Sequence, residues 1–213
     1  MFRLEKVIFK DVLDIESLKI KKNQVTCITG KSGSGKTTLM KLLNGLINTD
    51  SGEVYVDDQP VSEWDLVSLR RHVIMLQQTP SIYEGTIRDN LNIAREFSGL
   101  SPATDEELEQ ALQQVHLHKP LDQDIEDLSG GEKQRVALAR IELLNSEAVL
   151  LDEPTSALDE DTADAIIQDL FNRFKEKGQT IVMVTHSSEL VQKYADHVVH
   201  IVDGHVTEEK GAL

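Results

Sequence analysis

The stretch of sequence that decides the fold is Gly30-Lys31-Ser32-Gly33-Ser34-Gly35-Lys36-Thr37. An apolar run from Gln24 to Thr29 precedes it and predicts a buried strand, and leucines at helical spacing over Thr37 to Leu46 predict a helix after it. Glycines let a backbone wrap closely around phosphate groups, and the following helix adds its positive N-terminal end. The strand, the helix and the Lys36-Thr37 pair disfavour the alternative, a glycine-rich turn that merely joins a strand to a helix. The sequence therefore predicts a phosphate-binding loop.

Strands and helices alternate along much of the remaining chain, which indicates an α/β fold. The first twenty residues alternate apolar and polar side chains, and this pattern predicts short strands of an N-terminal antiparallel sheet. Apolar runs predict three further buried strands, at Ala148 to Asp152, Thr180 to Thr185 and Val198 to Val202. Strands that alternate with helices indicate a parallel sheet with helices on both faces. A helical pattern interrupts the alternation, so we expect one domain, 1–213, with a helical subdomain inserted at about 81–145.

Two adjacent carboxylates follow one of these strands: Asp152 ends it and Glu153 comes next. The carboxyl ends of parallel strands form the edge at which ligands bind in this fold class. At that edge Asp152 would hold Mg²⁺, directly or through water, and Glu153 would orient and polarise an attacking water. When these two residues are taken alone, an ordinary helix-capping cluster is an equal alternative.

A third motif, Leu128-Ser129-Gly130-Gly131-Glu132, lies between the phosphate loop and the carboxylate pair. A Ser-Gly-Gly turn ahead of a helix is common by itself, but here it opens the longer run Leu-Ser-Gly-Gly-Glu-Lys-Gln-Arg. The segment after the carboxylates is Pro154-Thr155-Ser156-Ala157-Leu158-Asp159. In this order the motifs resemble those of the ATPase subunit of an ABC transporter, and the resemblance covers the chain from about Phe2 to His205.

The resemblance implies a P-loop NTPase of ABC type with a mixed central sheet, and it implies ATP and Mg²⁺ as ligands. The nucleotide would be bound by Gly30, Lys31, Ser32, Gly33, Ser34, Gly35, Lys36, Thr37, Thr38, Ser129, Gly130, Gly131 and Asp159. Mg²⁺ would be held by Thr37, Gln78 and Asp152, and catalysis would depend on Glu153, His186, Lys36 and Gln78. The resemblance implies that Ser129 and Gly131 bind the γ-phosphate held by the phosphate loop of a second subunit. It also implies that Asp159 contacts that second subunit. One site would thus need two chains.

Two of these assignments rest on position relative to the other motifs. Gln78 matches the glutamine of the family's Q-loop, which reaches Mg²⁺ and links the site to the membrane subunit; Gln77 is adjacent, and alignment on Pro80 favours Gln78. His186 follows a buried strand at the place where the family has a histidine that contacts the γ-phosphate.

The chain departs from the family at the residue that would stack on the adenine base. An aromatic residue near the N-terminus usually stacks on adenine, but Asp11 stands where that ring is expected. Phe9 is a substitute, and a core position is the competing interpretation of Phe9.

Composition limits the classes of function. A chain of 213 residues is long enough for one large α/β domain. The net charge of −15 disfavours broad binding to nucleic acid and adhesion to anionic lipid, since both need clustered Lys and Arg. The single cysteine, Cys27, lies in an apolar run and predicts a buried structural thiol in a reducing compartment. No apolar run approaches the roughly 20 residues that span a bilayer.

Together these features predict an ABC-type ATPase that powers a separate membrane permease. We expect a homodimer closed head to tail around two nucleotides, no contact with nucleic acid, and membrane contact only through the permease. We expect the protein to be cytoplasmic and peripheral on the inner face of the cell membrane. The segment Gln78-Thr79-Pro80 resembles that of ATPases paired with metal-export permeases, which makes a metal ion a candidate substrate.

Two other functions compete with this interpretation. A soluble ABC ATPase that acts on nucleic acid or ribosomes would show a long coiled-coil insertion or tandem cassettes, and this chain has neither. A non-catalytic ATP-binding module would have lost Lys36, Asp152 or Glu153, and all three are present.

Overall fold

The computed structural model describes the backbone of residues 1–211, and the side chains of these except Asp161 and 208–211. The chain divides into two compact units. The first unit contains Met1–Met75, Ser146–Glu153 and the chain from Phe174 onward, and the second contains Leu76–Asn145 and Pro154–Arg173. The predicted α/β fold is confirmed, with the strands gathered in two sheets.

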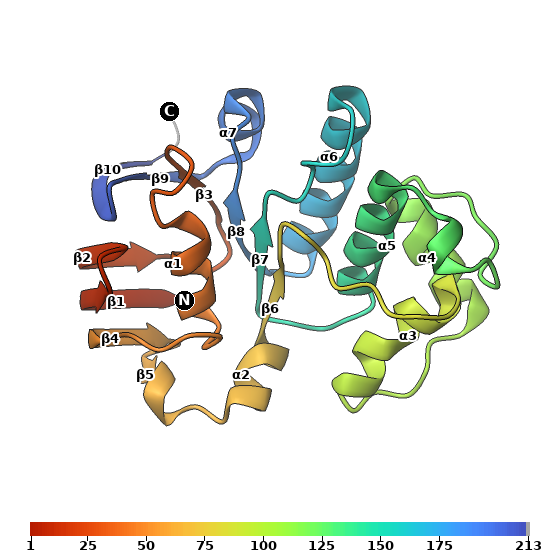
Figure 1. The fold of residues 1–213 in the computed structure, drawn as a ribbon, viewed down its shortest axis with the longest axis horizontal. Helices are drawn as coiled ribbons and strands as arrows, with labels where there is room; N and C mark the ends of the chain where they lie inside the picture. Colours follow the sequence, from red (N-terminus) through yellow and green to blue (C-terminus); the bar gives the residue numbers. More distant parts are fainter. Residues whose placement is uncertain (212–213) are drawn as a thin grey trace. The chain divides into compact units, whose positions relative to one another are not determined.

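The larger sheet is mixed, as predicted, and its strand order is β10-β9-β3-β8-β7-β6 (Figure 1). Its strands are β3 (Val25–Thr29), β6 (Val73–Leu76), β7 (Ala148–Asp152), β8 (Thr180–Val184), β9 (His197–Val202) and β10 (His205–Gly211). Strand β3 pairs in parallel with β8 and β9, and β7 pairs in parallel with β8. Strand β10 runs antiparallel to β9. The carboxyl ends of β3, β7 and β8 therefore meet at one edge.

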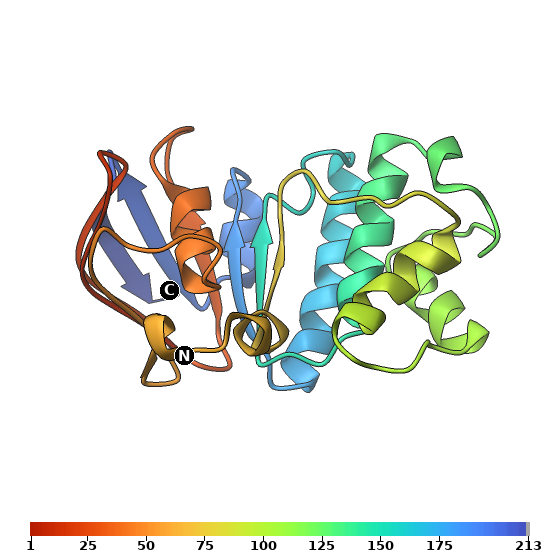
Figure 2. The same ribbon diagram turned by 60° about the horizontal axis from the view of Figure 1, so that its bottom comes forward.

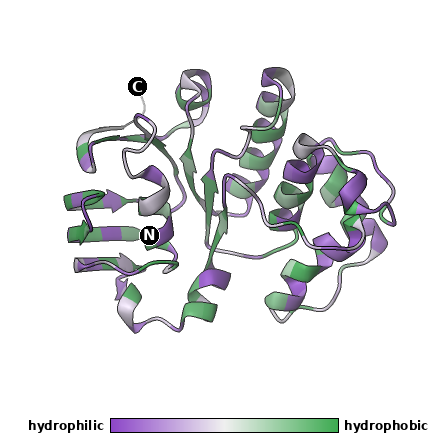
Figure 3. Cartoon of the chain, viewed as in Figure 1, coloured by the Kyte–Doolittle hydropathy of each residue, from purple (hydrophilic) through white to green (hydrophobic). Residues whose placement is uncertain are grey.

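The sequence of the central strands explains their position in the sheet. All five residues of β7 and all five of β8 are buried. Parallel strands with both faces covered are nearly continuous apolar runs, and Figure 3 shows these strands in the hydrophobic colour. The predicted strand at Ala148 to Asp152 is confirmed at both ends.

The smaller sheet is the predicted N-terminal antiparallel one, with strand order β2-β1-β4-β5. Its strands are β1 (Phe2–Phe9), β2 (Leu13–Ile20), β4 (Ser51–Val56) and β5 (Gln59–Pro60). Helix α1 (Lys36–Leu43) lies between this sheet and the strands that carry the phosphate loop (Figures 1 and 2). Its buried leucines Leu39, Leu42 and Leu43 share one hydrophobic core with residues of both sheets. This packing fixes the start of α1, and thus the phosphate loop, in the first unit.

The second unit is helical. It contains α3 (Ile87–Phe97), α4 (Asp105–Gln114), the 3₁₀ turn η2 (Ile125–Asp127), α5 (Gly130–Glu142) and most of α6 (Glu160–Glu176). Helices α3 and α4 both pack against α5. Leu108, Ala111 and Leu112 form a buried apolar stripe along α4.

The first unit has three further short helical elements, η1 (Val61–Glu63), α2 (Leu66–His72) and α7 (Ser188–Tyr194). Within the described residues, no helix has both the length and the apolar character needed to cross a membrane.

Candidate nucleotide site

The phosphate loop connects β3 to α1 and requires glycine at two of its positions. Gly30 has φ 145° and Gly35 has φ 101°, values that side-chain-bearing residues rarely adopt. A Cβ atom at Gly30 would lie 2.2 Å from the carbonyl oxygen of Ile201, and one at Gly35 would lie 2.6 Å from Leu13 Cδ2. The loop thus has the close backbone approach that the glycine pattern predicts.

Helix α1 begins without a side-chain cap. Its N-cap residue is Gly35, which has no side chain to accept a hydrogen bond from the first turn. By contrast, Thr86 caps α3, Thr104 caps α4 and Ser129 caps α5. The first N–H groups of a helix need an acceptor, and an anion at the helix N-terminus supplies one. The start of α1 is therefore suited to a phosphate group.

Lys36 points its ammonium group back into the phosphate loop. Its Nζ donates hydrogen bonds to the carbonyl oxygens of Gly30, at 2.9 Å, and of Lys31, at 2.8 Å. Burial lowers the pKa of Lys36, while the carboxylates of Glu153 and Asp152 act in the opposite direction. An ammonium group has three donors, so the third can reach a phosphate oxygen.

Asp152 carries a buried carboxylate at the end of β7. The residue is 1% exposed, and neither carboxylate oxygen accepts a geometrically sound hydrogen bond from the residues that the structure describes. Burial raises the pKa of Asp152 and the charge of Glu153 adds to this, while the nearby Thr37 hydroxyl acts in the opposite direction. Carboxylate and hydroxyl oxygens are the ligands that Mg²⁺ takes. The chemistry of Asp152 and Thr37 is therefore compatible with Mg²⁺, which these two residues would hold.

Glu153 and His186 meet beside this carboxylate. The two lie 3.1 Å apart, from His186 Nε2 to Glu153 Oε1. The backbone of Glu153 is left-handed, with φ 49°, and its N–H donates to the carbonyl oxygen of Val184 at 3.0 Å. Seven other non-glycine residues of the described chain share this left-handed conformation, so the position of Glu153 rests on its contacts rather than on its strain. The structure thus brings together the predicted catalytic carboxylate and the predicted histidine.

The third motif opens helix α5 in the second unit. The Glu132 carboxylate accepts hydrogen bonds from the backbone N–H and the hydroxyl of Ser129, each at 2.9 Å. The N–H of Glu132 in turn donates to Ser129 Oγ at 3.3 Å, which completes a capping box. Lys119 Nζ lies 3.0 Å from the other oxygen of Glu132. These contacts, the Ser129 N–H first, lower the pKa of Glu132 to about 2.

The start of α5 packs closely on the segment that follows Glu153. A Cβ atom at Gly131 would lie 2.8 Å from the carbonyl oxygen of Ala157, whereas one at Gly130 would meet nothing within 4 Å. The buried Gln134 donates from Nε2 to the carbonyl oxygen of Pro154 at 3.0 Å. Only glycine fits at position 131 without movement of the backbone.

The remaining predicted site residues have other surroundings. Asp159 caps α6, since its Oδ1 accepts a hydrogen bond from the N–H of Thr162 at 3.0 Å, and this bond lowers its pKa. Gln78 is exposed in the segment after β6. Phe9 packs against the hydrophobic core, which supports the core interpretation of this ring, and Asp11 is exposed. The roles of Asp159 and Gln78 toward ATP stay predictions.

Two residues that contact the third motif or the segment beside it were given no role in the sequence analysis. Lys119 lies outside every motif. Its ion pair with Glu132 exists only in the folded protein, so the sequence carried no signal for it. Gln134 stands three residues after Gly131, about one helical turn later, and that spacing could have placed both on the same side of α5.

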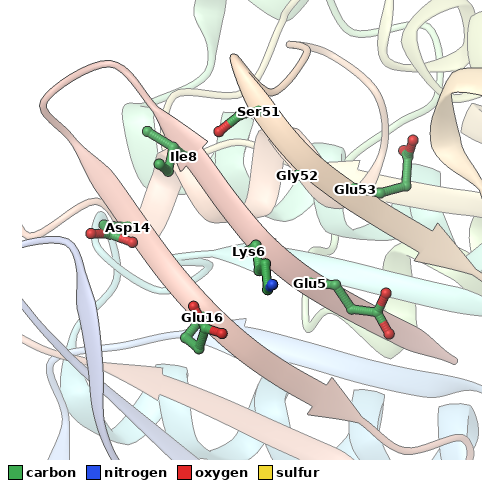
Figure 4. Close-up of a pocket in the computed structure, with 8 residues that line it drawn as sticks. All are labelled: Glu5, Lys6, Ile8, Asp14, Glu16, Ser51, Gly52 and Glu53. Atoms are coloured by element: carbon green, nitrogen blue, oxygen red, sulfur yellow. The ribbon is translucent and has the colours of Figure 1, made fainter.

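A separate pocket lies on the N-terminal sheet of the first unit (Figure 4). It has a volume of about 790 Å³ and is lined by Glu5, Lys6, Ile8, Asp14, Glu16, Ser51, Gly52 and Glu53. Four of these residues are acidic, one is a lysine, and none belongs to the three motifs. Because carboxylates repel phosphate, this pocket does not suit a nucleotide.

Comparison with known proteins decides the family. The family described as ABC transporter matches residues 13–156. The chain belongs to this family. ABC transporter I family member 17 of Arabidopsis thaliana is 37% identical over 90% of this chain and 73% of its own length. The putative ABC transporter ATP-binding protein YjkB of Bacillus subtilis is 35% identical over 93% of this chain and 78% of its own.

A solved structure supports the same assignment. An ATP-binding cassette, solved as a dimer in a post-hydrolysis state with ADP and phosphate bound, has a TM-score of 0.89 to this chain. The two are 29% identical, and the match covers 100% of this chain and 99% of that one. The predicted ABC-type ATPase is thus confirmed.

Other matches name different transported compounds. A carnitine transport ATP-binding protein of Listeria monocytogenes is 34% identical over 90% of this chain, which spans 49% of the relative's length. A methionine import ATP-binding protein of Rhizobium johnstonii is 37% identical over 92% of this chain and 56% of its own length.

Proposed function

We propose that this ABC ATPase powers a separate membrane permease as a head-to-tail dimer, from the cytoplasmic face of the cell membrane. The observation that carries the proposal is the buried Asp152 carboxylate at the end of β7. Neither of its oxygens accepts a sound hydrogen bond from the described residues, although Thr37 and Lys36 lie near enough to oppose the rise in its pKa that burial causes. A buried charge without a partner is costly and is retained where a ligand completes it. Mg²⁺, when bound by Asp152, would screen the negative charge of the ATP phosphates.

Each catalytic residue of the chain has one task in this proposal. Lys36 holds the outer phosphates of ATP through the ammonium group that now contacts the loop carbonyls. Glu153 orients and polarises the attacking water, and His186 moves from Glu153 to the γ-phosphate. Gln78 reports the state of the site to the permease. Catalysis of this kind depends on positioning and on charge stabilisation.

The second half of each site comes from the other copy. Ser129 and Gly131 lie at the start of α5, where backbone N–H groups can receive a γ-phosphate, and Asp159 would contact the opposite subunit. The solved relative described above is itself a dimer with hydrolysis products bound, which supports this arrangement. The two units of the chain would then work as one ATPase domain.

The transported substrate is set by the permease. Two of the relatives described above are named for carnitine and for methionine, and none of them is named for a metal ion. A metal ion as cargo therefore gains no support. Action on nucleic acid is disfavoured by the net charge of −15 and by relatives named as transporter subunits.

Substitution of Glu153 by Gln tests the proposal. Glu153→Gln keeps the shape of the side chain but removes the charge that polarises water. The variant should bind ATP, hydrolyse it orders of magnitude more slowly, and accumulate as an ATP-bound dimer in size-exclusion chromatography. Adding Lys36→Ala to the same chain is the matched control and should restore the monomer. A Glu153→Gln protein that stays monomeric with ATP argues against the two-chain site, and one with normal turnover removes Glu153 from catalysis.

A further inference from the structure

The proposed phosphate site at the start of α5 contains a carboxylate, which has the same negative charge as the phosphate it would receive. Glu132 belongs to the same helical turn as Ser129 and Gly131, and its side chain touches the Ser129 hydroxyl at 2.9 Å. Glu132 is ionised at neutral pH, as an ordinary glutamate is, and the hydrogen bonds from Ser129 and the contact with Lys119 lower its pKa further, to about 2. An ionised carboxylate this close to an incoming γ-phosphate would repel it.

Lys119 is placed to cancel that repulsion. Its Nζ lies 3.0 Å from Glu132 Oε1, while Oε2 takes both hydrogen bonds from Ser129. The pair is partly shielded from water, with 33% of the Lys119 side chain and 19% of the Glu132 side chain exposed. The neighbouring cation, Lys133, pairs with Glu126 instead, at 3.5 Å.

Lys119 also leaves the hydrogen bonds of the cap intact. The carboxylate of Glu132 needs one oxygen for Ser129, and Lys119 contacts the other. The charge is therefore neutralised without loss of the capping box, and the first N–H groups of α5 still point along the helix axis. The segment that supplies Lys119 lies between α4 and η2, outside the three motifs.

We propose that Lys119 is a positioning residue of the phosphate site: it neutralises Glu132, so that Ser129 and the first turn of α5 can receive the γ-phosphate of ATP bound to the other copy. This inference rests on the proposed two-chain site. It assigns to an ion pair a task that the motif residues cannot perform, because the motif itself contains the repelling charge.

The test measures ATP-driven dimerisation by sedimentation in the Glu153→Gln protein, which should hydrolyse ATP too slowly to disturb the measurement. Lys119→Met should raise the dissociation constant of the dimer about tenfold for each of the two sites, thus roughly a hundredfold in all. ATP binding to the single subunit, measured with a fluorescent ATP analogue, should stay unchanged. Lys119→Arg should restore the dimer, and Lys133→Met, which removes an equal charge one residue from Glu132, should have a much smaller effect.

A second background separates neutralisation from a merely structural role. Glu132→Gln keeps the capping hydrogen bonds but has no charge to cancel. In that background Lys119→Met should change the dissociation constant less than twofold. A loss of the same size in both backgrounds would overturn the inference, as would an unchanged dimer in Lys119→Met alone. If the Glu153→Gln parent fails to dimerise with ATP, the proposed function fails, and the inference falls with it.

Discussion

Asp152→Asn should make the nucleotide-free protein more stable while it destroys ATP hydrolysis. The folded chain buries the Asp152 carboxylate at 1% exposure without a sound hydrogen bond to either oxygen. Asn keeps the shape of the side chain and removes the charge. The same charge is what would hold Mg²⁺, so a gain of stability and a loss of function should come from one substitution.

The size of the gain follows from the cost of a buried charge. An ion buried without a partner costs several kcal/mol, but Lys36 and the Thr37 hydroxyl offset part of that here. The amide of Asn would itself stay partly unsatisfied, which costs about 1 kcal/mol or more. We therefore expect a net gain of about 1 to 2 kcal/mol in the free energy of unfolding, or roughly 3 to 6 °C in Tm for a chain of this length.

The pH dependence has a definite sign. The pKa of Asp152 is raised above its ordinary value of 3.8, so the folded state binds this proton more tightly than the unfolded state does. The wild-type protein therefore loses stability as pH rises through the raised pKa. The advantage of Asp152→Asn should therefore grow as pH rises above 3.8 and should vanish as pH falls toward 3.8.

Thermal unfolding of both proteins, from pH 4 to 8 and with and without Mg-ATP, checks this reasoning. The wild-type protein should gain stability from Mg-ATP by mass action, and the variant should gain much less. A nucleotide-free Asp152→Asn protein that melts below the wild type at pH 7 would refute the argument, because it would mean that the carboxylate makes stabilising contacts in the folded state.

Three further predictions concern other parts of the chain. Lys36→Ala should nearly abolish ATP binding, measured with a fluorescent ATP analogue, because the outer phosphates lose their cation; binding within twofold of wild type would contradict this. Cys27→Ser should keep ATPase activity but lower the free energy of unfolding by about 1 to 3 kcal/mol, since burial raises the pKa of this thiol to about 12 and a hydroxyl would be buried in its place. Gly131→Ala should lower Tm because its Cβ would lie 2.8 Å from the carbonyl oxygen of Ala157, whereas Gly130→Ala should not; equal Tm values would show that the segment yields easily.

The strands of the larger sheet could be predicted where both faces are buried. The runs at Ala148 to Asp152 and Thr180 to Thr185 are continuously apolar, so their pattern needs no knowledge of neighbouring strands. Strand β10 was missed because it pairs with β9 at the sheet edge and its sequence from His205 to Gly211 is mostly polar. Only its pairing with β9 makes that segment a strand.

The parts of the site that could be predicted are those whose residues are neighbours in the sequence. The phosphate loop forms from consecutive residues, and Asp152-Glu153 are neighbours. The partners of these residues come from elsewhere in the chain: His186 reaches Glu153 from the end of β8, and Ile201 makes Gly30 obligatory. Pairings of this kind depend on strand order, which no local pattern encodes.

One strand end of this chain combines a strained backbone with a buried charge. Glu153 has a left-handed backbone, Asp152 has a buried carboxylate that accepts no sound hydrogen bond from the described residues, and Lys36 is desolvated against two carbonyl oxygens. By contrast, the N-termini of helices α3, α4 and α5 are satisfied by complete capping boxes. A ligand that supplies phosphate oxygens to Lys36 and a cation to Asp152 would relieve two of these costs at once. The binding of Mg-ATP should therefore stabilise this edge of the sheet more than any other part of the first unit, and hydrogen exchange at the amides of β3 and β7 would measure that directly.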